Sequence, residues 1–232
     1  MAAVYGFLQA RLQAHHGARL DTATWHRLMG AEPFELFLAR ACSTVLGYWL
    51  EAVDPTAGIH HLELRLLEEL QRYLAAAASW APPAWRPAVL WLGKLPNLAI
   101  HLHRQGGGAA YSWMLLLEED HDIESVPVGG DVLSWWLQRW RQLWPQEQLP
   151  RRQLEQLIRL LQQHQRSLER LEGGDAAGNA RQQLQRHLEL LFRRFTLQPS
   201  ALFVHLALVA LDLEQLRGEL SRRRLFHTES IT

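Results

Sequence analysis

Hydrophobic residues recur at intervals of three and four along most of this 232-residue chain. The pattern is clearest in residues 199–226, where one apolar stripe runs through the segment. The stripe consists of Leu202, Phe203, Leu206, Val209, Leu213, Leu216 and Leu220. This spacing places its members on one face of a long helix. Pro199 suits the first position of that helix, because no N–H bond is needed there.

The polar residues of the same segment change after Leu211. Charged residues then occupy the other faces and end in Arg222, Arg223 and Arg224, in the last turns, where cations complement the helix dipole. We therefore expect this helix to begin in the core and to end in water. An arginine on its exposed face, such as Arg223, should contribute little to stability. The segment is interpreted as a packing and docking element without a catalytic role.

Similar periodicity predicts further helices, which are separated by proline, glycine or capping residues. Their expected ranges are 4–19, a short helix through Trp25 and Met29 after the capping residues Asp21 and Thr22, 33–46 ended by Gly47, 59–78, 88–104 with a break at Pro96, 131–144, 150–172 and 180–195.

The stretches between these helices are expected to be irregular. The prolines within residues 82–87 predict a turn. Residues 118–130 predict an acidic loop, and residues 173–180 predict a polar linker. Residues 109–120 fit either a short helix or a strand, because periodicity cannot decide for so short a run.

The period-two alternation typical of strands is almost absent, so the sequence predicts an all-α fold. The expected architecture is a funnel or bundle of repeated helical units. We expect an N-terminal helical unit of residues 1–108 and a C-terminal helical unit of residues 109–232, packed together or joined as one domain. A hydrophobic content of 48% is ample for a real core.

Charge and hydropathy narrow the possible partners. The chain has 24 basic and 24 acidic residues, so its overall field favours neither nucleic acid nor an anionic membrane. Its longest uncharged apolar stretch, residues 199–211, is shorter than the roughly 20 residues that span a bilayer. The N-terminus lacks the pattern of a signal peptide, so a cytoplasmic location is expected. The single cysteine, Cys42, forms no internal disulfide and is expected to be a buried thiol.

The chain's 12 histidines raise the question of metal binding. Glu118 and His121 have the spacing used by di-iron helical bundles, but that fold needs a second such pair, and we find none. A solvated acidic loop is the favoured interpretation of this stretch. A metal-dependent or hydrolytic helical enzyme that uses Glu118 and His121 remains the alternative. We assign no catalytic, cofactor-binding or metal-binding residue and expect no cofactor.

Tryptophan is abundant in residues 131–144, which contain Trp135, Trp136, Trp140 and Trp144. Trp136 and Trp140 lie four residues apart and therefore share a helical face. Core packing is the favoured interpretation. A protein-binding patch is the alternative, because tryptophan is enriched at interface hot spots.

Three segments together resemble a known family. Residues 4–50 contain Tyr5, Arg11, Leu20, Leu28 and Tyr48 in the expected order, residues 60–105 contain Asn97 and Leu98 after a long helix, and the last helix contains Glu214, Leu216 and Arg217 before a basic end. This arrangement resembles the C-type (in vacuolar enzymes, d-type) subunit family of bacterial and archaeal V/A-type rotary ATPases. The family fold repeats a helical unit three times, and the chain is short for it, with residues 105–150 as the region in which material is either missing or altered.

The resemblance implies a noncatalytic rotor adaptor of a proton- or sodium-translocating ATPase. Such an adaptor joins the central-stalk subunits to the membrane proteolipid ring and transmits torque between them. Its expected location is the cytoplasmic face of the inner membrane, with membrane contact only through the ring. A helical scaffold unrelated to rotary ATPases is a further alternative.

Overall fold

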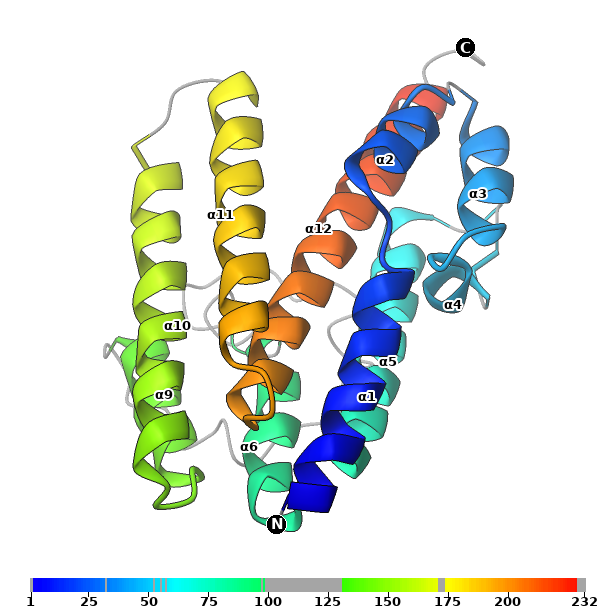
Figure 1. Ribbon diagram of the computed structural model, residues 1–232. Coiled ribbons are helices and arrows are strands. Elements are labelled where there is room, and N and C mark those ends of the chain that lie inside the picture. The colour runs from blue at the N-terminus through cyan, green and yellow to red at the C-terminus, as the bar shows by residue number, and fades with distance from the viewer. Residues whose placement is uncertain are drawn as a thin grey trace. The chain divides into compact units, whose positions relative to one another are not determined.

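The computed structural model describes residues 2–31, 33–51, 53–54, 56, 58–96, 98, 131–170 and 174–228. In these ranges the chain forms α-helices and short 3₁₀ helices, and no strand (Figure 1). The predicted all-α fold is therefore confirmed. No helix among the described residues is long and apolar enough to cross a bilayer.

The described residues form helices in the following chain order. Their bounds are α1 Ala2–Ala18, α2 Thr22–Met29, α3 Phe34–Cys42, α4 Gly47–Leu50, α5 Ile59–Trp80, η1 Pro83–Trp85, α6 Arg86–Trp91, η2 Leu92–Lys94, α9 Val132–Gln142, α10 Gln148–Leu168, α11 Gly174–Arg194 and α12 Ser200–Thr228.

The chain divides into two compact units, and each draws on both halves of the sequence. Unit 1 contains α1, η1, α10, α11 and α12 as far as Gln215, together with Trp80. Unit 2 contains α2, α3, α4, α5 up to Ser79, α6, η2, α9 and α12 from Leu216 onward. The boundary expected between residues 108 and 109 lies outside the described residues.

Unit 1 combines α10 and α11 with α1, which is distant from them in sequence. Helices α10 and α11 run side by side in opposite directions (Figure 1). Helix α1 joins them through Tyr5, whose hydroxyl lies 3.2 Å from a carboxylate oxygen of Glu147, and through Gln9, whose side-chain oxygen accepts the N–H of Leu197 at 2.9 Å. The core of this unit includes Leu8, Leu12, Leu154, Leu157, Leu188, Phe192, Phe195, Leu202, Phe203 and Leu206.

Unit 2 packs α2 against α3, α3 against α4, and α6 against α9. The last pair is joined by Trp140, whose Nε1–H donates to the carbonyl of Ala88 at 2.8 Å. Trp91 of α6 stacks on Trp136 of α9, with ring centroids 6.3 Å apart. The tryptophans of α9 thus act as core residues of unit 2.

Capping explains two helix starts that the sequence predicted. Asp21 is the N-cap of α2 and accepts the N–H of Thr24 at 2.7 Å, and Asp131 is the N-cap of α9 and accepts the N–H of Ser134 at 3.1 Å. These bonds satisfy backbone donors that a helix leaves without partners in its first turn.

The predicted end of α3 at Gly47 is wrong. This helix ends at Cys42, where the hydroxyls of Ser43 and Thr44 donate to the carbonyls of Arg40 and Ala41, and Gly47 instead begins α4. Such side-chain bonds compete with continued helical pairing. A Cβ at residue 47 would overlap the carbonyl oxygen of Cys42, so this close approach requires glycine.

Two other predicted boundaries are also wrong. The expected linker of residues 173–180 is helical from Gly174 onward, as the start of α11. Packing of α11 on α10 outweighs the low helix propensity of its glycines. Helix α6 ends at Trp91, ahead of the expected break at Pro96, and a 3₁₀ turn follows in which Gly93 accepts a bond from the Gln71 amide at 2.6 Å.

Candidate functional site

The basic end of α12 forms a buried polar arrangement in the described part of unit 2. Arg223 is buried, with 4% of its surface exposed. Its Nη2 donates to the carbonyl of Met29 at 2.7 Å, and its Nε donates to the carbonyl of Ala31 at 3.1 Å. Its Nη1 donates to the carboxylate of Glu219, one turn earlier on α12. The guanidinium also lies 4.2 Å from the ring centroid of Phe37.

These contacts explain how a charged group is held in the core of unit 2. Met29 and Ala31 lie at the carboxyl end of α2, where a helix has carbonyl groups without intrahelical partners and a partial negative charge. Arg223 supplies both the donors and the positive charge. Glu219 and the ring of Phe37 contact the rest of the guanidinium. These contacts offset the free-energy cost of burying its charge.

The expectation that Arg223 lies on an exposed face is therefore wrong, and the described end of α12 does not simply project into water. Arg223 continues the apolar stripe, because it lies three residues after Leu220 and seven after Leu216, both of which are buried. The spacing of Arg223 from Leu216 and Leu220 in the sequence therefore indicated that Arg223 is buried. The charge of Arg223 suggested a solvent position, although a long side chain can bury its stem.

Neighbouring arginines bind other parts of unit 2. Arg224 donates to the carbonyl of Thr56 at 2.7 Å, and Nε of Arg217 lies 3.0 Å from a carboxylate oxygen of Glu63 on α5. Arg222 differs, since it is exposed and pairs with Glu219 of its own helix at 3.2 Å. We call Arg217, Arg223 and Arg224 the arginine anchor. It fastens the end of α12 to α2, α3, α5 and the segment near Thr56.

Three tryptophans in α9 and just after it are core residues, which confirms the favoured interpretation. Trp136, Trp140 and Trp144 are 2%, 4% and 3% exposed. Their rings follow one another with centroid distances of 5.5 Å and 5.0 Å. Trp135 is half-buried and lies 6.2 Å from the ring of Trp91. A row so deeply buried offers little area for a partner protein.

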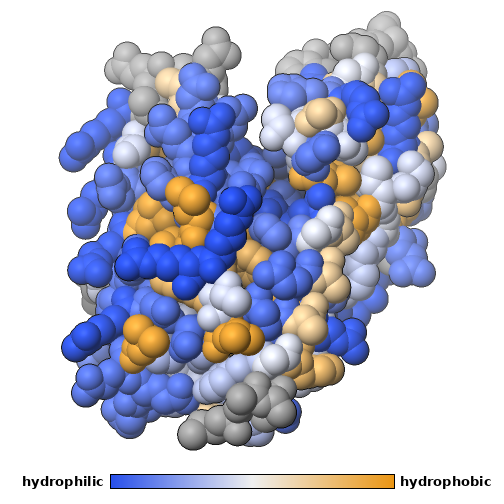
Figure 2. All heavy atoms as spheres, in the orientation of Figure 1, coloured by the Kyte–Doolittle hydropathy of each residue, from blue (hydrophilic) through white to orange (hydrophobic). Residues whose placement is uncertain are grey.

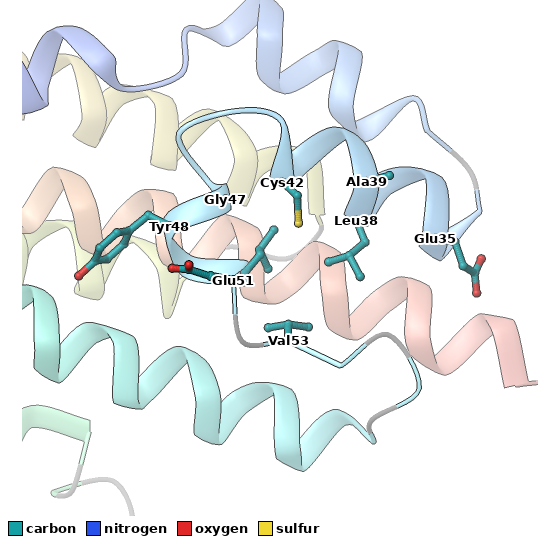
Figure 3. A pocket seen from close by; sticks show the side chains of 9 residues that line it. Glu35, Leu38, Ala39, Cys42, Gly47, Tyr48, Glu51 and Val53 are labelled. Atoms are coloured by element: carbon teal, nitrogen blue, oxygen red, sulfur yellow. The ribbon is translucent and has the colours of Figure 1, made fainter.

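Cys42 is exposed, so the prediction of a buried thiol is wrong. It lies at the last position of α3 and lines a pocket of about 600 Å³ in unit 2 (Figure 3). The pocket lining comprises Glu35, Leu38, Ala39, Cys42, Gly47, Tyr48, Leu50, Glu51 and Val53. Partial burial raises the pKa of the Cys42 thiol, which keeps it protonated near neutral pH and makes it a poor nucleophile.

Histidines gather with aromatic rings in unit 1. His15 stacks on Trp80 at 4.5 Å, His16 stacks on Phe192 at 4.3 Å, and His205 lies 6.2 Å from His15. Burial, with a smaller effect of Arg11, lowers the pKa of His15. In the described ranges no three histidine, cysteine or acidic side chains come together in a way that could hold a metal ion. Glu118 and His121 lie outside these ranges.

The residues that carry the family resemblance have different surroundings. Leu28, Leu98 and Leu216 are buried, whereas Tyr48 is 44% exposed at the pocket. Arg11 is exposed and lies over the ring of Phe7 on its own helix, with 5.5 Å to the centroid. Asn97 is outside the described residues. The first and last resembling segments meet at the arginine anchor, through α2 and α3 on one side and α12 on the other.

Hydrophobic residues on the face seen in Figure 2 lie in separate groups among hydrophilic side chains. Scattered exposed apolar residues are normal for folded proteins and do not by themselves mark an interface. Comparison of the chain with protein-family models, with curated proteins and with solved structures found no match.

Proposed function

We propose that this protein is a noncatalytic rotor adaptor of a V/A-type ion-translocating ATPase, which couples the central stalk to the proteolipid ring. The observation that best supports the proposal is the arginine anchor. Arg223 joins the last helix to Met29 and Ala31, so two resembling segments that are far apart in sequence form one packed structure. Separate segments of one subunit family should pack together in this way.

The physical demands of an adaptor agree with the observed packing. Torque can pass only through a body that resists bending, and close-packed helical cores with low compressibility meet this demand. Helix α12 contributes to the core of both units, with Leu206 buried in unit 1 and Leu216 and Leu220 buried in unit 2. This shared helix is the element that we assign to force transmission.

The partners under this proposal are the central-stalk subunits and the proteolipid ring. Contact with the membrane is indirect, because the ring supplies the spanning segments, and the protein acts as a peripheral component on the cytoplasmic face of the inner membrane. The balanced charge of the chain is consistent with this role, since it provides no strong attraction to anionic lipid.

Affinity purification from native membranes tests the proposal. The tagged protein should bring with it the catalytic-head, stalk and ring subunits of a rotary ATPase. Deleting the protein should leave ATP hydrolysis by the catalytic head while ATP-driven ion pumping fails. Recovery of no ATPase subunit, or normal pumping in the deletion strain, contradicts the adaptor role. A stoichiometric metal in the purified protein, lost in a Glu118→Ala, His121→Ala double variant together with function, favours the enzyme alternative.

A further inference from the structure

The pocket between α3 and α4 is not used by the arginine anchor. Its floor is formed mainly by apolar groups, among them Leu38, Leu50 and Val53. Its volume of about 600 Å³ lies within the range of pockets that bind ligands or partner side chains. An open apolar hollow of this size can take an aliphatic side chain together with part of the chain that carries it.

The charge of the lining selects the kind of partner. Among the described residues that form it, Glu35 and Glu51 are acidic and none is basic. Figure 3 shows Glu35 on one side of Leu38, Cys42 and Val53 and Glu51 on the other side. An occupant with an apolar centre and a positive charge on each side matches this order, and electrostatic complementarity of this kind mainly sets specificity.

Reaction chemistry does not explain the pocket. The protonated Cys42 thiol is a weak nucleophile, and none of the described residues of the lining is a histidine that could take its proton. The thiol therefore acts as an apolar wall of the cavity. An apolar contact with an ion pair on each side, in which the pocket supplies the carboxylates and the partner the cations, is typical of peptide docking. Since both carboxylates are on exposed residues, the attraction should weaken as salt rises.

We propose that the α3–α4 pocket docks a segment of a partner protein in which an aliphatic residue is flanked by lysine or arginine. The aliphatic side chain enters between Leu38 and Val53, and the flanking cations approach Glu35 and Glu51. The proposal does not depend on the rotor assignment, because it rests only on the shape and charge of this pocket.

Cys42 provides a built-in reporter, because it is the only cysteine of the chain and lines the pocket. The full-length protein is mixed with a short synthetic peptide that has Lys-Leu-Lys at its centre, and the rate at which a thiol reagent modifies Cys42 is measured. The matched control peptide has Glu-Leu-Glu at the same place. The basic peptide should slow modification several-fold at saturation, and the acidic peptide should have no effect.

Reversing the charge of Glu51 tests whether the basic peptide binds at this pocket. In Glu51→Lys the affinity for the basic peptide should fall about fivefold, as expected for losing one exposed ion pair and adding one repulsion. Helical content and melting temperature verify the fold of the variant. For the unchanged protein, protection by the basic peptide should decrease between low and high salt, which tests the same idea without a mutation.

Four results would overturn the proposal. The first three are no protection of Cys42 by the basic peptide, equal protection by both peptides, and protection that is independent of salt and of Glu51→Lys. A fourth is protection that rises with protein concentration in the absence of peptide, which would assign the pocket to a second copy of the chain. Failure to recover ATPase subunits from membranes bears only on the rotor role and leaves the peptide result unaffected.

Discussion

The two parts of helix α12 are buried by different means. Up to Leu213, in unit 1, apolar residues are buried on several faces, and Leu202, Leu206 and Leu208 are 0%, 6% and 0% exposed. From Leu216 onward, in unit 2, one face remains buried, but Arg223 is part of it. The first part is held mainly by apolar burial, and the buried polar residues in it are Ser200 and His205. The last part is also held by directed bonds from one guanidinium to the end of α2.

On α12, burial follows position on the stripe even where the residue is charged. An apolar stripe identifies the buried face of a helix but not every residue type on that face. A charged residue can occupy the next position of the stripe if another helix end offers carbonyl groups and a negative dipole to it. The first part should therefore be sensitive to a new charge, and the last part should be sensitive to the loss of one.

The largest expected effect is that of Leu206→Asp in the first part of α12. The carboxylate would enter an apolar core without a partner, and we expect a loss of more than about 4 kcal/mol in the free energy of unfolding. Chemical denaturation followed by circular dichroism measures it. Leu206→Met preserves volume and should cost less than about 1.5 kcal/mol. Similar midpoints for Leu206→Asp and the unchanged protein would show that this part is not core.

Arg223→Ala should give the next largest effect. It removes the side-chain donor from the buried carbonyl of Ala31 and the part-buried carbonyl of Met29, and we expect a loss of about 2–4 kcal/mol. The matched control is Arg222→Ala, an exposed neighbour in a surface ion pair, with a loss below about 1 kcal/mol. Arg223→Lys should restore only part of the stability, because an ammonium group lacks the forked geometry. Equal losses in the free energy of unfolding for Arg222→Ala and Arg223→Ala would show that the buried arginine contributes no more to stability than the exposed one.

The pH dependence of stability should be set in part by His15 of α1, which lies beside the first part of α12. His15 lies 6.2 Å from the buried His205, and its pKa is held below its ordinary value of 6.5, chiefly by burial. The folded protein therefore binds protons less readily than the unfolded chain at this position. The stability that His15 contributes is complete above pH 6.5 and decreases as the pH falls below that value.

Denaturation at about pH 8 and about pH 5 measures this effect. In His15→Asn the difference between the two pH values should be smaller than in the unchanged protein, because one of the groups that resists protonation is gone. Hydrogen exchange should show the acid-induced loss of protection first in the part of α12 that contains His205. An unchanged pH difference in His15→Asn would contradict the assignment.

The smallest expected effect concerns the turn that leads into α12. Leu197 has a positive φ of 60°, in the left-handed region where glycine is favoured, and its side chain is 51% exposed. Leu197→Gly should relieve strain and raise the stability by roughly 0.5 kcal/mol, after allowance for the greater freedom of glycine in the unfolded chain. The melting temperature would rise slightly. A decrease would show that the exposed leucine makes a stabilising contact.

Much of the fold could be predicted from the local sequence. The helix starts at Asp21 and Asp131 and the stripe from Leu202 to Leu220 depend on spacing and capping chemistry within a few residues. The shared face of Trp136 and Trp140 could be predicted for the same reason, because the two residues lie four apart on one helix. Local geometry is sufficient wherever a residue's environment is set mainly by its own helix.

Residues whose surroundings come from distant segments could not be placed in this way. Arg223 is buried because the end of α2 lies beside it. Cys42, the last residue of α3, is exposed at a pocket whose lining also includes α4 and Val53. The start of α11 at Gly174 likewise depends on packing against α10. Hydrophobic periodicity describes one segment at a time. The burial of a charged group or a thiol depends on which other segments pack against it, and only the tertiary structure determines that packing.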